Sequence, residues 1–140
     1  MSVISMLVIK AAQPPSLDEL RKEARQGGDP IDFVQDVDLN AHDGYLPVRA
    51  YGRDTGFEFY FEPISEGEVP DDALRYGGHT IMTRTGGDFE EARAAFLFLK
   101  VAARLTNGAC VFPDDETVVA PDQVDAYLAA QIEECNRFIK

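Results

Sequence analysis

The chain has 140 residues, of which 45% are hydrophobic and 27% charged, the proportions of an ordinary globular protein. These values exclude a chain that is disordered throughout and predict a single α+β domain over residues 1–140 with its own core. The 25 acidic and 13 basic residues give a formal net charge of −12, which excludes a general affinity for nucleic acid or anionic lipid.

The N-terminal part of the chain predicts one strand and one helix. Val3 to Ala12 is nearly all apolar and partly β-branched, which is typical of a buried strand. Ser16 and Glu19 then form the pattern of a capping box, and they predict a helix that runs to about Gln26. Gly27-Gly28 ends this helix.

The next segment predicts a long loop followed by two strands. Asp29 to Leu46 has no clear hydrophobic period and is interpreted as an acidic loop. Pro47 to Tyr51 and Phe57 to Phe61 are predicted strands, joined by a turn-rich linker at 52–56. In the second strand the apolar residues Phe57, Phe59 and Phe61 alternate with Glu58, Tyr60 and Glu62, which suit a face in contact with water. This alternation predicts a sheet that is covered on one face only.

The second half predicts two helices and three strands. After an acidic connection with a short turn near Asp71 to Leu74, Gly78 to Thr85 is a predicted strand. Asp88 caps a helix to about Leu105 whose interior is apolar nearly all round, so it should be the central buried helix. A hairpin over 109–120 and a last helix from Asp122 follow. This order favours an α+β fold with a mostly antiparallel sheet of about five to six strands and helices packed on one face.

The acidic residues are segregated along the chain. No Lys or Arg occurs between Gln26 and Val48, between Asp54 and Leu74, or between Leu105 and Asn136, and these windows hold 19 of the 25 acids. The acidity serves either solubility or the attraction of a basic partner. In the second case the candidate binding residues lie in the acidic loops: Asp36, Asp38, Asp43, Asp71, Asp72, Asp114, Asp115 and Glu116.

One of these loops has part of a calcium-binding pattern. The segment from Asp36 to Asn40 carries side-chain oxygens at alternate positions, as an EF-hand loop does. The pattern then fails, because Ala41 stands where the sharp turn needs glycine and Pro47 stands where a bidentate glutamate belongs. We therefore predict no metal site and interpret the segment as a solvated loop with Asx turns.

The sequence contains no recognisable catalytic constellation, and we expect no catalytic residues and no cofactor. His79 begins a predicted strand and is the alternative candidate for a ligand site, with Cys110 or Thr80 as conceivable nucleophiles. Gly86-Gly87 precedes a helix as a phosphate loop does, but no Walker lysine follows and Asp88 would repel a phosphate.

The layout of the second half resembles a known class of proteins. It consists of an Ala-rich helix that ends in Leu105-Thr106-Asn107-Gly108, a hairpin over 109–120 and a capped final helix from Asp122. In this layout the chain resembles small acidic bacterial proteins of the polymorphic-toxin immunity type. The resemblance implies a protein that binds and blocks a cognate toxin and has no catalytic residues.

We therefore expect a non-catalytic protein-binding domain, in its most concrete form an immunity-type inhibitor of a basic toxin or enzyme. The alternative is a small enzyme or ligand-binding protein whose site the sequence does not reveal. No signal peptide or membrane span is expected, and Cys110 and Cys135 are interpreted as small buried residues. Together these features predict a cytoplasmic protein.

Overall fold

A computed structural model describes residues 2–139. Within this range the chain forms seven strands, three α-helices and three short 3₁₀ turns. The strands are β1 (Val3–Ile9), β2 (Ile31–Phe33), β3 (Gly44–Ala50), β4 (Arg53–Pro63), β5 (His79–Thr85), β6 (Ala109–Phe112) and β7 (Thr117–Val119). The helices are α1 (Leu17–Gly27), α2 (Phe89–Thr106) and α3 (Val124–Asn136), and the 3₁₀ turns are η1 (Asp71–Tyr76), η2 (Pro113–Asp115) and η3 (Pro121–Gln123).

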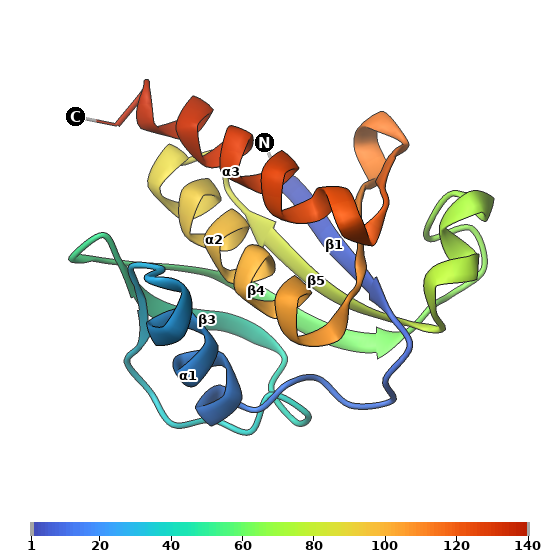
Figure 1. Cartoon of the computed structure of the whole chain (residues 1–140), viewed down its shortest axis with the longest axis horizontal. Coiled ribbons are helices and arrows are strands. Elements are labelled where there is room, and N and C mark those ends of the chain that lie inside the picture. The colour runs from blue at the N-terminus through green and yellow to red at the C-terminus, as the bar shows by residue number, and fades with distance from the viewer. Residues whose placement is uncertain (1, 140) are drawn as a thin grey trace.

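The strands form one antiparallel sheet in the order β2-β3-β4-β5-β1-β6-β7. The three α-helices lie together in a layer over one face of this sheet (Figure 1). The predicted fold class, α+β with a mostly antiparallel sheet and helices on one face, is therefore confirmed. The sheet has seven strands rather than the expected five to six.

The core lies between the sheet and α2 and is centred on one aromatic side chain. The ring of Phe98 on α2 contacts Phe33 of β2 (centroids 6.1 Å apart) and both Phe57 (5.0 Å) and Phe59 (5.9 Å) of β4. Phe57 and Phe59 are fully buried, as their alternation predicts, and Phe61 is half-buried on the same face. The prediction that α2 is the central buried helix is confirmed, because ten of its residues are buried.

The predictions for the segment from Asp29 to Gly56 were partly wrong. Three residues of the expected loop form the edge strand β2, and β3 begins at Gly44. Residues 53–56 of the expected linker are instead part of β4, because the chain reverses within two residues, Tyr51 and Gly52. Both have positive φ angles, 53° and 75°, the geometry of the tight turn that matches the twist of a hairpin.

The predicted helix ends are confirmed for α1 and α2 but not for α3. Ser16 and Glu19 form the reciprocal capping box of α1, and the Asp88 carboxylate accepts hydrogen bonds from two backbone N–H groups of the first turn of α2. The last helix begins at Val124 and has no side-chain cap, so the expected cap at Asp122 was wrong. Asp122 lies in η3, which supplies the first turn instead.

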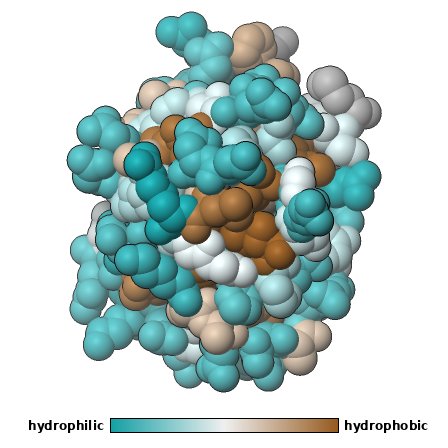
Figure 2. Space-filling model, turned by 90° about the vertical axis from the view of Figure 1, so that its right-hand side faces the viewer, coloured by the Kyte–Doolittle hydropathy of each residue, from teal (hydrophilic) through white to brown (hydrophobic). Residues whose placement is uncertain are grey.

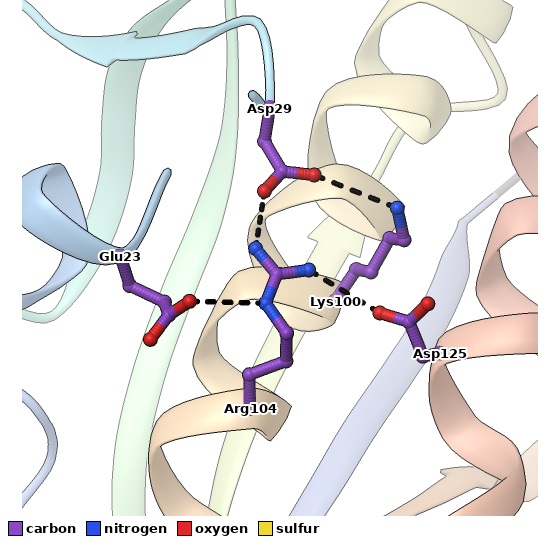
Figure 3. A network of polar contacts seen from close by, with 5 residues as sticks. All are labelled: Glu23, Asp29, Lys100, Arg104 and Asp125. Atoms are coloured by element: carbon purple, nitrogen blue, oxygen red, sulfur yellow. Dashed lines mark hydrogen bonds and ion pairs between the residues drawn. The ribbon is translucent and has the colours of Figure 1, made fainter. Parts of the chain in front are cut away.

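A network of charged side chains joins the three helices (Figure 3). The Asp29 carboxylate, just after α1, is 4% exposed and pairs with Lys100 (Nζ–Oδ1 3.5 Å) and Arg104 of α2. The Arg104 guanidinium also contacts Glu23 of α1 at 3.2 Å and Asp125 of α3 at 3.2 Å. Arg104 therefore ties both neighbouring helices to α2.

Both edges of the sheet are short. β2 and β7, the outer strands, have three residues each and leave part of their neighbours without a partner strand. Where β3 extends beyond β2 it contains Pro47, which has no N–H to donate. The carbonyl oxygen of Tyr45, in the same stretch, accepts a hydrogen bond from His42 Nε2 (2.9 Å).

Candidate functional site

The face of the sheet opposite the helices carries apolar side chains over its central strands. Side chains alternate between the two faces of a strand, so each strand contributes a second set that points away from α2. On β1, β5, β6 and β7 this set is largely aliphatic: Ile4, Met6, Val8, Met82, Val111 and Val118. We call this surface the open face, since no α-helix covers it.

The segment that connects β4 to β5 covers one part of the open face. Val69, just before η1, and Ala73, within η1, are buried against Val8 and Val111 in a second hydrophobic cluster. Beyond η1, side chains such as Ile4 and Met82 remain partly exposed. Figure 2 looks onto the side where η1 and the β6–β7 hairpin lie and shows an apolar patch bounded by hydrophilic residues.

Acidic residues border this apolar surface. Glu58 and Glu62 project from β4 onto the open face, Asp71 and Asp72 begin η1, and three further acids, Asp114, Asp115 and Glu116, form the tip of the β6–β7 hairpin. Arg84 lies across from Glu58, and the Arg75 guanidinium lies over the ring of Tyr76 at 4.9 Å. The border of the open face is therefore mixed in charge, with an excess of acids.

Tyr60 lies in the middle of β4 on the open face. Its hydroxyl donates to Glu58 at 2.6 Å, and this hydrogen bond, more than partial burial or the charge of nearby Asp43, raises the pKa of the Tyr60 hydroxyl. Asp43 directly precedes β3 and acts on Tyr60 from there. The predicted residue Asp43 therefore lies near Tyr60, one residue before the Gly44–Phe59 pair of β3 and β4.

The structure divides the predicted binding residues into two groups. Asp43, Asp71, Asp72 and the hairpin acids at 114–116 border the open face or flank it. Asp36 and Asp38 lie on the other side, beside Ser16 and Leu17 at the start of α1. The acidic loops therefore do not form one continuous surface, and only the first group adjoins the apolar side chains of the open face.

Within residues 2–139, no group of three or more His, Cys, Asp or Glu side chains is arranged to hold a metal ion. Asp36 forms an ion pair with Arg21 at 2.9 Å, and the Asp38 carboxylate accepts a hydrogen bond from the backbone N–H of Asn40 at 3.0 Å. The second contact is an Asx turn, the arrangement predicted for this loop.

Millimolar calcium should therefore leave the melting temperature unchanged, because a ligand raises it only by binding the folded state more tightly than the unfolded state. Differential scanning fluorimetry with and without calcium measures this. A saturable rise in the wild type that disappears in the Asp36→Ala/Asp38→Ala double variant would contradict the prediction.

The His79 region does not assemble a nucleophile and a base. The imidazole is stacked on Phe61, with ring centroids 5.3 Å apart and planes 7° apart. Thr80 points to the opposite face of the sheet and donates to Glu68 at 3.2 Å. Cys110 lies on β6, with β1 between it and β5, and burial raises the pKa of its thiol to about 12. At neutral pH this thiol holds its proton and is a poor nucleophile.

Sequence reasoning missed the apolar residues of the open face. The signal was nonetheless present in β1, where both alternating sets of side chains are apolar although helices were expected on one face only. A strand of that kind must either be covered on its second face by another segment or expose apolar surface. In this structure η1 covers part of that face and the rest stays accessible.

Comparison of the chain with models of known protein families and with curated proteins finds no match. Among residues 2–139, each helix is too short or too polar to cross a lipid bilayer.

Proposed function

We propose that this chain is a non-catalytic protein-binding domain that takes a partner with a basic surface onto its open face. The observation that carries the proposal is the apolar centre of this face, around Met82 and Ile4, together with its acidic border. Apolar side chains surrounded by a polar rim are the usual anatomy of a protein–protein interface. An exposed apolar patch is also costly to keep on a monomer unless it serves binding.

The charge distribution supports a basic partner. The hairpin tip carries three consecutive acids, Asp114, Asp115 and Glu116, and all three are exposed. Acids on the rim of an interface act mainly by steering the encounter with a positively charged surface, and they repel nucleic acid. In its specific form, the proposal is an immunity-type inhibitor of a basic toxin or enzyme that acts in the cytoplasm. The two free, buried cysteines accord with a reducing compartment.

The experiment that tests this proposal compares two lysine substitutions of equal charge. Met82→Lys places a cation in the centre of the open face, and Ala130→Lys places one on the exposed side of α3 as a matched control. The wild-type chain is used to capture a basic protein from the cells that produce it, and the binding kinetics of the purified pair are then measured. We expect Met82→Lys to weaken binding by about tenfold or more, as for a central interface residue, and Ala130→Lys to leave it unchanged.

The same kinetics at two salt concentrations test the role of the acids. Exposed charges are screened over a Debye length of about 8 Å at physiological ionic strength, so association should slow as salt rises while dissociation changes little. If Met82→Lys binds as tightly as the wild type, or if no basic protein is captured, the proposed function is wrong.

A further inference from the structure

A hollow of about 310 Å³ lies beside the open face, in the segment that connects β4 to β5. Its lining includes the apolar residues Ile64, Val69 and Leu74 and the acidic residues Glu66 and Asp71, both of which are exposed. The remaining lining comes from small residues, Ser65, Gly67, Gly77 and Gly78. This hollow lies on the side of the molecule that Figure 2 shows. We call it the η1 pocket.

The walls of the η1 pocket are fixed by hydrogen bonds on both sides. The Glu68 carboxylate accepts from the backbone N–H of Ser65 and from the Thr80 hydroxyl, each at 3.2 Å, so it ties the loop to β5. The N–H of Ile64 donates to the carbonyl of Gly78 at 3.0 Å and closes the base of the segment. The hollow is therefore built into the fold rather than formed by a loose loop.

Gly77 fixes the far end of the segment against β1. A Cβ atom at this position would lie 2.0 Å from the carbonyl oxygen of Ile9, so only glycine allows the two backbones to come this close. Val69 and Ala73 are buried against the sheet at the same time. The segment is held at its start, its middle and its end.

The η1 pocket combines apolar and anionic groups that have no partner of their own. Leu74 is 50% exposed on the pocket wall. The carboxylates of Glu66 and Asp71 take part in no hydrogen bond or ion pair with any residue that the structure describes. The chain has no Lys or Arg between Asp54 and Leu74, and the guanidinium of the next residue, Arg75, lies over the ring of Tyr76 at 4.9 Å. A ligand that fits must bring an apolar stem and a positive charge together.

Lysine and arginine side chains have this composition. They pack a chain of methylene groups along apolar surface while the charged end reaches water or a carboxylate. A purely apolar group would leave the two carboxylates partly desolvated without compensation. A small cation alone would be bound by two carboxylates without a third His, Cys, Asp or Glu ligand among the described residues. It would also leave Leu74 exposed.

We propose that the η1 pocket receives one lysine or arginine side chain of the basic partner. This inference rests on the proposed function and adds to it the chemical nature of an anchor residue and the place where it binds. The pocket adjoins the acidic border, so a cation entering it meets favourable charge along its approach. Binding of a single side chain should be weak, in the millimolar range, because only a few groups take part.

The test is an NMR titration of the ¹⁵N-labelled protein with four small probes. N-acetyl-arginine methylamide and N-acetyl-lysine methylamide carry the proposed side chains. N-acetyl-norleucine methylamide keeps an apolar stem without the charge, and N-acetyl-glycine methylamide has neither. We expect the cationic probes to cause saturable shifts of the amides of Gly67, Leu74, Gly77 and Gly78, with norleucine about tenfold weaker and glycine without effect.

Two double variants decide whether the shifts report the pocket. Glu66→Gln/Asp71→Asn keeps the size of the side chains and should remove saturable binding. Asp36→Asn/Asp38→Asn removes the same charge from the loop beside the start of α1, on the other side of the molecule, and should leave it unchanged. The inference is overturned if norleucine binds as tightly as arginine, if Glu66→Gln/Asp71→Asn still binds, or if the shifts spread evenly over all acidic loops.

The titration and the capture experiment can fail separately. The probes report the η1 pocket without any partner, whereas Met82→Lys reports the open face with the captured protein. If a partner is captured and binds the Glu66→Gln/Asp71→Asn variant with unchanged affinity, the partner does not use the pocket. In that case this inference is wrong, while the proposed function stands. If no partner is captured, the proposed function is wrong, and with it the assignment of the pocket to a partner.

Discussion

Replacing Phe98 by alanine should lower the free energy of unfolding by about 3–5 kcal/mol, the range for deleting a fully buried aromatic side chain. Phe98 is 1% exposed, and its ring contacts Phe33, Phe57 and Phe59. Its removal would leave a cavity between α2 and the strands β2 and β4. Urea denaturation followed by far-UV circular dichroism measures the change.

Phe89→Ala is the matched control, because it makes the same chemical change on the same helix at a position that is 44% exposed. Phe89 stacks on Phe138 with ring centroids 4.6 Å apart, and the loss of this one pair should cost roughly 1 kcal/mol. If Phe98→Ala does not fold, Phe98→Leu retains most of the volume and should still cost more than Phe89→Ala. Equal denaturation midpoints for the Phe98 and Phe89 variants would show that the core is not centred on Phe98.

Asp29→Ala should be the second largest loss, roughly 2–3 kcal/mol, because it leaves two cations without their shared carboxylate. The Asp29 side chain is 4% exposed, whereas those of Lys100 and Arg104 are 20% and 27% exposed. The cost should stay below that of breaking a fully buried ion pair, since both cations retain access to water. The same urea denaturation measures it.

Asp125→Ala is the control for this prediction. Asp125 contacts the same guanidinium at 3.2 Å, but its side chain is 60% exposed, so its removal should change the stability by about 0.5 kcal/mol or less. A double-mutant cycle of Asp29→Ala with Arg104→Ala should give a favourable coupling energy. A coupling near zero would mean that Asp29 is no more than a surface charge.

Much of the fold could be predicted because local signals were strong and agreed with one another. The alternation of Phe57, Phe59 and Phe61 predicted which face of β4 lies in the core. Their partners on β3 and β5, such as Leu46 and Ile81, also point to that face. The caps at Ser16 and Asp88 satisfy backbone N–H groups by short-range contacts, so they can be found from a few neighbouring residues. These features need no knowledge of the rest of the chain.

Other elements depend on contacts distant in sequence and could not be predicted. Residues 31–33 become a strand because they pair with residues 48–50 of β3 and because Phe33 packs on Phe98. In the turn, Tyr51 adopts a backbone conformation in the left-handed region of the φ/ψ map. This conformation occurs mainly at Gly, Asn and Asp, so the sequence did not predict it at a tyrosine. There Tyr51 also contacts the Arg93 guanidinium at 4.0 Å, a contact that only the packed structure creates.

The candidate site could be predicted only in part. The acids at 71–72 and 114–116 could be identified from the segregation of charge, but their common place around the open face depends on the position of β1 between β5 and β6. That strand order brings Met82, Met6 and Val111 side by side from three separate parts of the chain. The η1 pocket likewise depends on the close approach of Gly77 to Ile9.

The short outer strands have a consequence for how the protein behaves at high concentration. An exposed strand edge can act as a template on which a second copy adds its own strand, and such additions can grow into aggregates. Here β2 and β7 offer three residues each, Pro47 lacks a donor, and the Tyr45 carbonyl is already bound by His42. The short edges of the sheet therefore resist the edge-to-edge addition of a second copy, while the open face remains accessible.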